Sequence, residues 1–206
     1  MLNDDVSPSL INYDKISSLI PDVMNALYNE LAFNSTSLGE IRDAFRVKQL
    51  QGKAWLLGQV QDHVDPASKI LVIGSWIGFT SYCLFNMGYT DITEIDPDAR
   101  LEPVAQHLNR FNKNFTHITK DVNQIDLSRY DAIINTSCEH ILDNQWFERI
   151  RHDTLLFLHS IDYPSWDHVN LCKDLSEMVN KYPMELIYSG TLDLGQYRRF
   201  MLVGKK

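Results

Sequence analysis

Apolar residues in the first part of the chain recur at steps of three and four positions, which is the spacing of one face of a helix. Between residues 13 and 31 this apolar stripe comprises Ile16, Leu19, Ile20, Val23, Met24, Leu27 and Leu31. The pattern predicts a helix. We expect Pro21 to interrupt or restart it, because proline lacks the N–H group that a helix interior needs.

A second helical segment is expected after the first. Ser37 and Glu40 have the spacing of a capping box, in which the two side chains bond the free N–H groups at a helix start. The sequence therefore predicts a helix from about Leu38 toward His63, with Gly52 as the point at which it would break.

Strand-like and helix-like patterns alternate from residue 69 onward. The strand-like runs cover residues 70–73, 91–95, 117–119, 130–135 and 154–158, and the helix-like runs cover residues 80–87, 99–111 and 166–182. One face of the second of these helices carries Leu101, Val104, Ala105, Leu108 and Phe111. Such alternation is typical of a parallel sheet covered by helices.

The last two strand-like runs, residues 185–192 and 199–203, are separated only by a short stretch that contains Gly195. Parallel neighbours need a connection of a dozen or more residues, so these two runs must pair antiparallel or splay apart. The predicted fold class is α/β, with a three-layer α/β/α architecture, a mainly parallel sheet, a C-terminal antiparallel hairpin and a helical N-terminal extension. Turn residues 65–68 divide an N-terminal cover, residues 1–65, from a sheet domain, residues 66–206.

Length and charge narrow the classes of function. A chain of 206 residues suits one α/β domain with an appendage. The net charge of −8 disfavours a surface that tracks nucleic-acid phosphates, and it favours a small-molecule or protein substrate. No apolar run approaches the ~20 residues that span a bilayer, and the first residues are acidic where a secretory signal is basic. We therefore expect no membrane association and a cytoplasmic location.

Two groups of residues have plain interpretations. The cysteines are too few and too scattered for a disulfide framework or a zinc site, and we expect reduced thiols at Cys83, Cys138 and Cys172. One basic cluster consists of Arg42, Arg46, Lys48 and Lys53. It could approach an anionic substrate or form a solvated helix face, and the solvated face is favoured.

The first strand of the predicted sheet leads into a bend that carries chemistry. Its apolar run ends at Gly74, a second glycine follows at Gly78, and an acid, Asp96, lies 22 positions after Gly74. A short turn at the carboxyl end of a buried strand allows backbone N–H groups and a helix N-terminus to face a polar ligand. An acid about 20 residues further on can hold ribose hydroxyls. The segment is therefore typical of a nucleotide-binding crossover.

With this bend, the element order and the final hairpin, residues 68–206 resemble the class I S-adenosylmethionine-dependent methyltransferases, a Rossmann-like family with a seven-stranded sheet. The resemblance does not extend to the first third of the chain. It implies that S-adenosyl-L-methionine is the cofactor, and that its methionine end is wrapped by Gly74, Ser75, Trp76 and Gly78.

The resemblance also assigns roles along the next three strands. Asp96 matches the acid that binds ribose, Asp121 matches the acid that meets the adenine amino group, and Val122 supplies the neighbouring backbone contact. Asn135 lies where the fourth strand opens toward the reacting methyl group.

Two positions depart from the pattern of the family. Val72 stands where the first motif has an acid, and Trp76 stands where it has its middle glycine. The indole of Trp76 could crowd the methionine portion of the cofactor, or it could turn outward and form a pocket wall.

Glu139 and His140 follow the fourth strand at the sheet edge where ligands of open α/β folds bind. His140 is the first candidate for a general base, because histidine titrates near neutral pH. In the alternative interpretation, His140 packs on the following helix and Glu139 stabilises the positive N-terminus of that helix. Cys138 is expected to pack as a small apolar residue, since methyl transfer needs no covalent protein intermediate.

The loop after the fifth strand is dense in polar and aromatic residues. Tyr163 or Trp166 could stack on a planar substrate, or Ser165 could cap a helix in a purely structural turn. The spacing of Asp162 and Asp167 matches no metal-ligand pattern, so no metal site is predicted.

In the N-terminal extension, three residues are candidates to cover the cofactor: Tyr13, Lys53 and Trp55. The favoured interpretation of Trp55 is an anchor that packs the extension onto the sheet.

The function that these observations favour is methyl transfer from S-adenosyl-L-methionine to a small-molecule or protein acceptor that the sequence does not identify. One alternative is a methyltransferase-like binding or assembly protein without turnover. A nicotinamide-dependent dehydrogenase is disfavoured, because the chain lacks a Gly-x-Gly-x-x-Gly pattern and ends in a hairpin.

Overall fold

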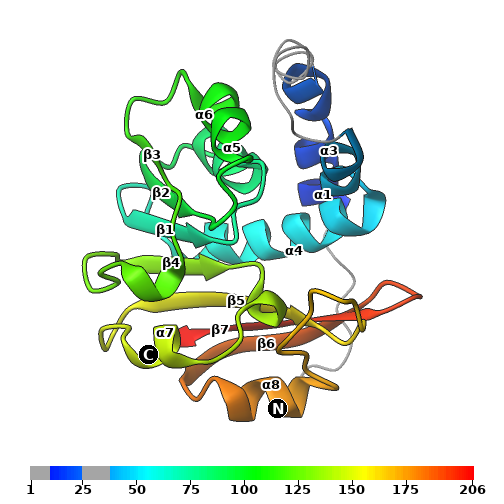
Figure 1. Cartoon of the computed structure of the whole chain (residues 1–206), viewed down its shortest axis with the longest axis vertical. Helices are drawn as coiled ribbons and strands as arrows, with labels where there is room; N and C mark the ends of the chain where they lie inside the picture. Colours follow the sequence, from blue (N-terminus) through cyan, green and yellow to red (C-terminus); the bar gives the residue numbers. More distant parts are fainter. Residues whose placement is uncertain (1–9, 25–37) are drawn as a thin grey trace.

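A seven-stranded sheet forms the centre of the protein (Figure 1). The computed structural model describes residues 10–24 and 38–206. The strands are β1 (Lys69–Ile73), β2 (Asp91–Ile95), β3 (Phe115–Ile118), β4 (Ala132–Asn135), β5 (Leu155–Ile161), β6 (Glu185–Asp193) and β7 (Arg198–Lys205). Their order across the sheet is β3-β2-β1-β4-β5-β7-β6.

The first five strands pair in parallel, and the last two add an antiparallel hairpin. β7 lies between β5 and β6 and runs antiparallel to both. The predicted fold class is confirmed, and the two C-terminal runs pair rather than splay.

Burial explains why the central strands read as continuous apolar runs. In β1, every residue after Lys69 is buried, and all four residues of β4 are buried. Alternate side chains serve opposite faces: Ile70 and Val72 belong to one apolar core, while Leu71 and Ile73 belong to the other. A parallel sheet covered on both faces has this pattern.

The helices form the two outer layers. One face of the sheet is covered by α4 (Val47–His63), α5 (Phe79–Asn86) and α6 (Glu102–Asn109), and the other by α7 (Gln145–Glu148) and α8 (Leu175–Lys181). Two 3₁₀ turns, η1 (Val122–Gln124) and η2 (Cys138–His140), follow β3 and β4. Within the described residues, no helix combines the length and the apolarity that crossing a bilayer needs.

The N-terminal helices agree with the predicted pattern in part. The first, α1 (Leu10–Ser17), ends at a turn, and helix resumes at residue 20 with Pro21 in its first turn, where a missing N–H costs little. The restart at Pro21 is confirmed, while the predicted continuation through residues 25–31 lies outside the described residues.

The second predicted helix is divided, but not at Gly52. It consists of α3 (Leu38–Ala44) and α4, separated by a turn at residues 45–46, and Gly52 lies inside α4. Ser37 of the predicted capping box lies outside the described residues, so the box stays a prediction. The absence of a side chain at Gly52 serves packing, because a Cβ there would lie 2.9 Å from Arg199 Nε.

Two further sequence predictions for helices were wrong. The segment predicted as helix over 166–182 is irregular until Asp174, whose side chain accepts a hydrogen bond from Glu177 N–H and caps α8. On α6 the predicted apolar face is buried at Leu101, Val104, Ala105 and Leu108. Phe111 lies past the end of that helix, is 81% exposed and has the guanidinium of Arg110 over its ring.

Trp55 joins the N-terminal helices to the sheet, as predicted. Its indole is buried, stacks on the ring of His159 in β5 at 5.5 Å, and donates a hydrogen bond of 3.1 Å to the Tyr188 hydroxyl in β6. The residue therefore connects α4 to two strands at once.

Candidate functional site

The bend after β1 uses three left-handed backbone positions in five residues. Gly74, Trp76 and Gly78 have φ values of 65°, 55° and 77°. Glycine adopts this region freely, whereas a side chain such as that of Trp76 is disfavoured there by about 1–2 kcal/mol. The bend turns the chain from the carboxyl end of β1 into α5.

Both glycines also allow close approach. A Cβ on Gly78 would lie 3.0 Å from Ala105 Cα, so the bend could not contact α6 as it does. Asn109 of α6 donates a 3.1 Å hydrogen bond to Gly78 O and fixes this contact. A Cβ on Gly74 would overlap the Ser137 side chain, which brings the segment after β4 against the bend.

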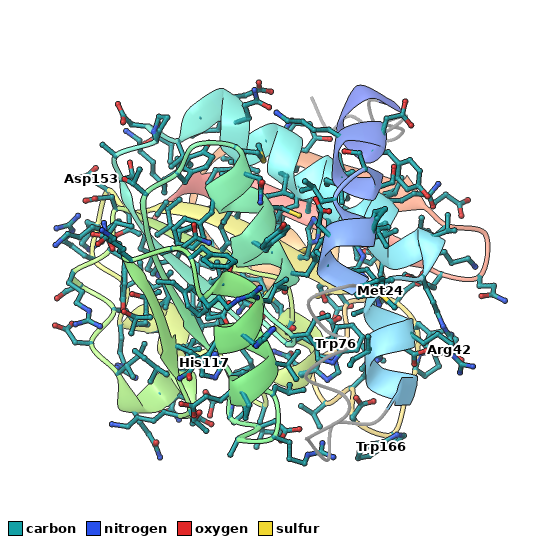
Figure 2. All side chains as sticks on the ribbon, turned by 90° about the horizontal axis from the view of Figure 1, so that it is seen from above. Met24, Arg42, Trp76, His117, Asp153 and Trp166 are labelled. Atoms are coloured by element: carbon teal, nitrogen blue, oxygen red, sulfur yellow. The ribbon has the colours of Figure 1, made fainter. Side chains whose placement is uncertain are left out.

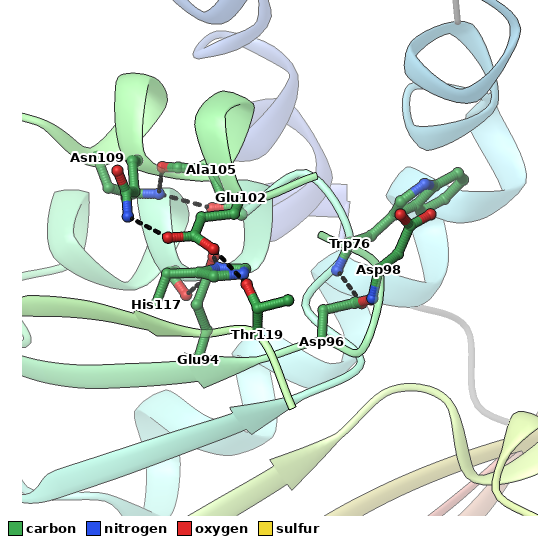
Figure 3. Close-up of polar contacts among 12 residues, drawn as sticks. Trp76, Glu94, Asp96, Asp98, Glu102, Ala105, Asn109, His117 and Thr119 are labelled. Carbon is green, nitrogen blue, oxygen red and sulfur yellow. Dashed lines mark hydrogen bonds and ion pairs between the residues drawn. The ribbon is translucent and has the colours of Figure 1, made fainter. Parts of the chain in front are cut away.

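Asp96 holds the bend from the end of β2 (Figure 3). Its Oδ2 accepts a hydrogen bond of 3.1 Å from Trp76 N–H, and its Oδ1 accepts one of 3.0 Å from Asp98 N–H. Burial raises the pKa of this carboxyl above its ordinary value, and the two backbone hydrogen bonds oppose that shift. A carboxylate has about four lone-pair sites, so capacity remains for ribose hydroxyls.

Polar atoms without partners lie at the carboxyl ends of β1 and β4, where the chain leaves these two neighbouring strands in opposite directions. The chain proceeds from β1 toward β3 on one side and from β4 toward β6 on the other, so this gap is the topological switch point at which open α/β sheets bind ligands. Ser75 Oγ and Asn135 Nδ2 are buried here with no hydrogen-bond partner among the described residues. Asn135 Oδ1 accepts a 2.9 Å hydrogen bond from Ser137 N–H, which fixes the amide with its N–H groups unused.

The indole of Trp76 extends from the bend away from Asp96 and toward the N-terminal helices (Figures 2 and 3). It is half-buried against the apolar core on that side, and Lys53 Nζ of α4 lies 5.8 Å from the ring centroid. This orientation agrees with the alternative in which the indole forms a wall beside the bend.

Asp121 and Val122 follow β3 at the same sheet edge. The exposed side chain of Asp121 accepts a 2.7 Å hydrogen bond from Asn123 N–H and caps η1, while Val122 is buried in the core. The contact with adenine that the resemblance assigns to them stays a prediction.

Glu139, His140 and His168 converge beside η2. One potential ligand atom from each lies within 4.8 Å of the others. Glu139 is only 4% exposed, burial raises the pKa of its carboxyl, and its Oε2 has no hydrogen-bond partner. The His140 and His168 rings are 4.7 Å apart and nearly perpendicular.

A second polar group lies between α4 and the strands β5 and β7. Burial, followed by the charge of Arg199, lowers the pKa of Lys53 to about 8. Burial and the same charge hold the pKa of His159 well below its ordinary value, so this ring is neutral. The prediction of a solvated face was therefore wrong for Lys53, which is half-buried and has its ammonium group over the Trp76 ring. It holds for Arg42 and Arg46, which are exposed beside Asp43.

The cysteines are free, as predicted, and all three are buried. Burial holds the pKa of the Cys138 thiol well above its ordinary value and raises that of Cys83 to about 12. A protonated, buried thiol is a poor nucleophile, so packing describes the role of Cys138.

The loop after β5 contains a turn, but not the helix cap that was predicted at Ser165. Trp166 is 95% exposed and lies at the rim of the molecule (Figure 2), and Ser165 starts no helix. The carboxylate of Asp162 is engaged in an ion pair of 2.7 Å with Arg198. Stacking of Tyr163 or Trp166 on a substrate stays a prediction.

His168 is the residue of this site that sequence reasoning missed. The sequence pattern indicates no role for His168, whereas it makes Glu139 and His140 candidates at this sheet edge. The available signal was positional: both segments follow parallel strands that are neighbours, and the carboxyl ends of such strands meet at one edge.

No protein-family model matches the chain, and no curated protein matches it by sequence. Solved structures do match. The N-methyltransferase NodS from Bradyrhizobium japonicum WM9 aligns with a TM-score of 0.62 and 12% identity over 79% of this chain and 98% of that one. Magnesium protoporphyrin IX methyltransferase from Synechocystis PCC 6803, with bound S-adenosylhomocysteine, aligns with a TM-score of 0.60 and 14% identity. The alignment covers 93% of this chain and 99% of that one.

A third match, the Pyrococcus abyssi tRNA (uracil-54, C5)-methyltransferase in complex with S-adenosyl-L-homocysteine, gives a TM-score of 0.56 and 13% identity. It covers 75% of this chain but only 38% of the matched one. The sheet order with β7 between β5 and β6 also differs from the order 3-2-1-4-5-6 of dinucleotide-binding domains. The chain therefore has the fold of the class I S-adenosylmethionine-dependent methyltransferases.

Proposed function

We propose that this protein binds S-adenosyl-L-methionine and transfers its methyl group to a small-molecule or protein acceptor. The observation that carries the proposal is the constellation at the switch point. A buried acid, Asp96, closes a glycine bend there, and two buried polar groups, on Ser75 and Asn135, have no partner among the described residues. Buried polar groups without partners are costly, so a polar ligand at this place would be stabilised by them.

The residues suit the parts of this cofactor. Asp96 has free lone pairs for ribose hydroxyls, and the bend presents backbone at the methionine end. The cofactor supplies an electrophilic methyl group, so the chain has to align the acceptor and to accept a proton where the acceptor carries O–H or N–H. No protein nucleophile is required, in agreement with the buried thiol of Cys138.

Proton acceptance is assigned to the Glu139 and His140 pair. His140 Nδ1 lies 3.2 Å from Asp167 O, and a carbonyl oxygen can only accept, so Nδ1 carries the hydrogen and Nε2 has the free lone pair. The ring is partly exposed beside η2, at the edge where Asn135 ends β4. General-base catalysis of this kind contributes about 10²–10⁴-fold in rate.

Asp96→Asn tests cofactor binding. The variant keeps one acceptor oxygen but loses the charge, which removes about 1.5–3 kcal/mol of charged hydrogen bonding and weakens S-adenosylhomocysteine binding about 10- to 100-fold. Isothermal calorimetry measures the change. Asp131→Asn is the matched control, because Asp131 bonds Lys69 N–H at the opposite edge of the sheet. Equal affinity in the Asp96 and Asp131 variants would contradict the assignment.

A binding protein without turnover is the second candidate. It is favoured by the bulky Trp76 in place of a glycine and by the Ser137 side chain that fills the space over Gly74. Incubation with methyl-labelled cofactor and a broad panel of small molecules and proteins separates the two functions. Label in an acceptor, reduced at least tenfold by His140→Ala with cofactor affinity unchanged, supports the enzyme. Tight cofactor binding with no labelled acceptor supports the second candidate.

A further inference from the structure

We propose that Glu139, His140 and His168 form a binding site for one divalent transition-metal ion such as Zn²⁺ or Mn²⁺. The three residues come from two segments that the sheet brings together: η2, directly after β4, and the loop between β5 and α8. One potential ligand atom from each lies within 4.8 Å of the others. A small movement of side chains would bring all three onto a common ion.

The types of ligand indicate the type of ion. Two imidazole nitrogens and one carboxylate oxygen form the set found in catalytic zinc sites and in non-haem iron sites, which keep coordination positions open for water or substrate. Calcium and magnesium prefer oxygen ligands alone, so a site with two histidines disfavours them.

The buried carboxylate points independently to a cation. Glu139 is 4% exposed, and its Oε2 has no hydrogen-bond partner. Burying an ionised carboxylate without a partner is costly, and an ion bound to that oxygen would remove the cost. Among the described residues, Glu139 forms no ion pair; the charges of Arg199, His140 and His168 act on its carboxylate without one.

Both histidines have a hydrogen-bond partner of the kind that supports metal-bound histidines. His140 Nδ1 lies 3.2 Å from Asp167 O and 3.4 Å from Asp167 Oδ2, and His168 Nδ1 lies 2.6 Å from Tyr163 O. Because these oxygens accept hydrogen, Nδ1 is the protonated nitrogen of each ring and Nε2 keeps its lone pair. A backbone carbonyl or carboxylate on the second ring nitrogen is the ordinary outer support of a metal-bound histidine.

The backbone holds the two segments in register. Val169 N–H and Asn170 N–H both donate to Glu139 O, at 2.9 Å and 3.0 Å. The loop that carries His168 is thereby attached to the residue that supplies the carboxylate. The His140 side chain is 40% exposed, so an ion has a path to the site from solvent.

Asp167 is the closest competitor for the two rings. Its carboxylate lies 3.4 Å from His140 Nδ1 and 4.0 Å from His168 Nε2, and it could form an ordinary surface ion pair with a protonated histidine. That alternative predicts no binding of transition metals. The metal site predicts tight binding of one ion per chain, and the two outcomes are separable in a direct titration.

The test uses the untagged full chain after treatment with a chelator. Titration with Zn²⁺ and Mn²⁺ by calorimetry is expected to give one tight site, while Mg²⁺ binds at least tenfold more weakly. Co²⁺ is expected to give the visible absorption bands of a low-coordinate site. Glu139→Gln and His168→Ala each remove one of three ligands and should weaken Zn²⁺ binding by more than about 100-fold, beyond the loss typical of an outer-support residue.

His152→Ala is the matched control, because His152 is exposed in the turn before β5, at the opposite end of that strand. Its Zn²⁺ affinity should equal that of the unchanged protein. If Glu139→Gln does not fold, His140→Ala replaces it, since that side chain is largely at the surface. No Zn²⁺ binding, or equal binding by the His152 and His168 variants, would overturn the proposal.

Ion binding is measured without any methyl transfer, so failure here leaves the proposed function standing. Success would change the role of one residue, an inference that rests on the proposed function. His140 Nε2 cannot hold an ion and accept a proton at once, so in the metal-bound protein His140 acts as a ligand. Turnover that requires added Zn²⁺ or Mn²⁺ distinguishes this role from that of a free base.

Discussion

Lys53 is the residue whose charge is hardest to explain by stability alone. Its ammonium group lies over the Trp76 ring, and burial together with the Arg199 charge lowers its pKa to about 8. Two like charges kept near each other inside a protein are costly, and such arrangements are common at functional sites. The position of Lys53 beside the bend makes it a candidate to contact an anionic group of a ligand.

Lys53→Met is expected to stabilise the ligand-free protein at pH 7. At that pH, below about 8, Lys53 is protonated in both the folded and the unfolded chain, so the folded protein bears the full cost of its charge. As pH rises from about 8 toward 10.5, the folded protein releases this proton first, and the cost disappears. Urea unfolding of both proteins at pH 7 and near pH 10 should therefore show an advantage of the variant that shrinks with pH.

Lys48→Met serves as the control for the loss of a lysine on the same helix. Lys48 donates a 2.7 Å hydrogen bond to Gln196 Oε1 at the surface, so its replacement should change stability by less than about 0.5 kcal/mol at either pH. A Lys53 variant that is less stable than the parent at pH 7 would contradict the account of its charge.

At the scale of elements, the contact between α4 and β7 depends on one missing side chain. Arg199 of β7 runs along α4, where its Nη2 donates a 3.2 Å hydrogen bond to Gln49 Oε1 and its Nε packs against Gly52. A glycine within a helix usually costs about 1 kcal/mol relative to alanine. Here the glycine allows a charged side chain to lie between the helix and the sheet.

Gly52→Ala should therefore destabilise the protein, against the usual trend for helices. The new Cβ would lie 2.9 Å from Arg199 Nε, and overpacking of this kind costs about 1–3 kcal/mol. In an Arg199→Ala background the same change should stabilise by about 1 kcal/mol, because only the helix preference remains. Denaturant unfolding of the four proteins measures this reversal. A Gly52→Ala effect that is the same in both backgrounds would argue against the contact.

The elements that the sequence predicted correctly are those whose burial is uniform. β1 and β4 read as unbroken apolar runs because both faces are covered, and the final hairpin followed from a connection too short for a crossover. The failures have local causes. Residues 166–174 contain helix-compatible residues, but their backbone is engaged by η2 through the bonds to Glu139 O. Gly52 resembled a helix breaker only because its partner, Arg199, is distant in sequence.

The candidate site, like the fold, was predicted in part. The bend and the strand-end position of Asp96 followed from glycine spacing and strand order, and both are present. Convergence of His168 with Glu139 could not be read from spacing, since the two lie on different crossovers. The inward orientation of Lys53 was also hidden, because a helical face looks the same whether it meets water or another polar side chain.

At the scale of the whole molecule, the N-terminal helices and the sheet share one apolar core. Ile16 and Leu57 from the helices belong to the same cluster as Val72 and Met201 from the strands. The boundary at residues 65–66 separates two sequence patterns. It does not separate two cores, because within the described residues the N-terminal helices pack into the same core as the sheet. The two parts are expected to unfold together.

A single transition in urea is the expected result, with the same midpoint by tryptophan fluorescence and by far-UV circular dichroism. Trp55→Ala should lower the free energy of unfolding by about 3–5 kcal/mol, because it removes a buried indole that contacts β5 and β6. Trp166→Ala is the control, since that side chain is exposed, and should change it by less than about 0.5 kcal/mol. Two separate transitions would show that the helices form an independent unit.

The place of β7 between β5 and β6 has a consequence for the nascent chain. During synthesis on a ribosome, β6 emerges before β7, yet its only partner in the sheet is β7. Until residues 198–205 have left the exit tunnel, β5 presents an open edge and β6 has nothing to pair with, a condition that favours chaperone binding or aggregation. The sheet can therefore be completed only after β7, the last of its strands in sequence, has been made, and slowing the ribosome over the hairpin would prolong the vulnerable stage.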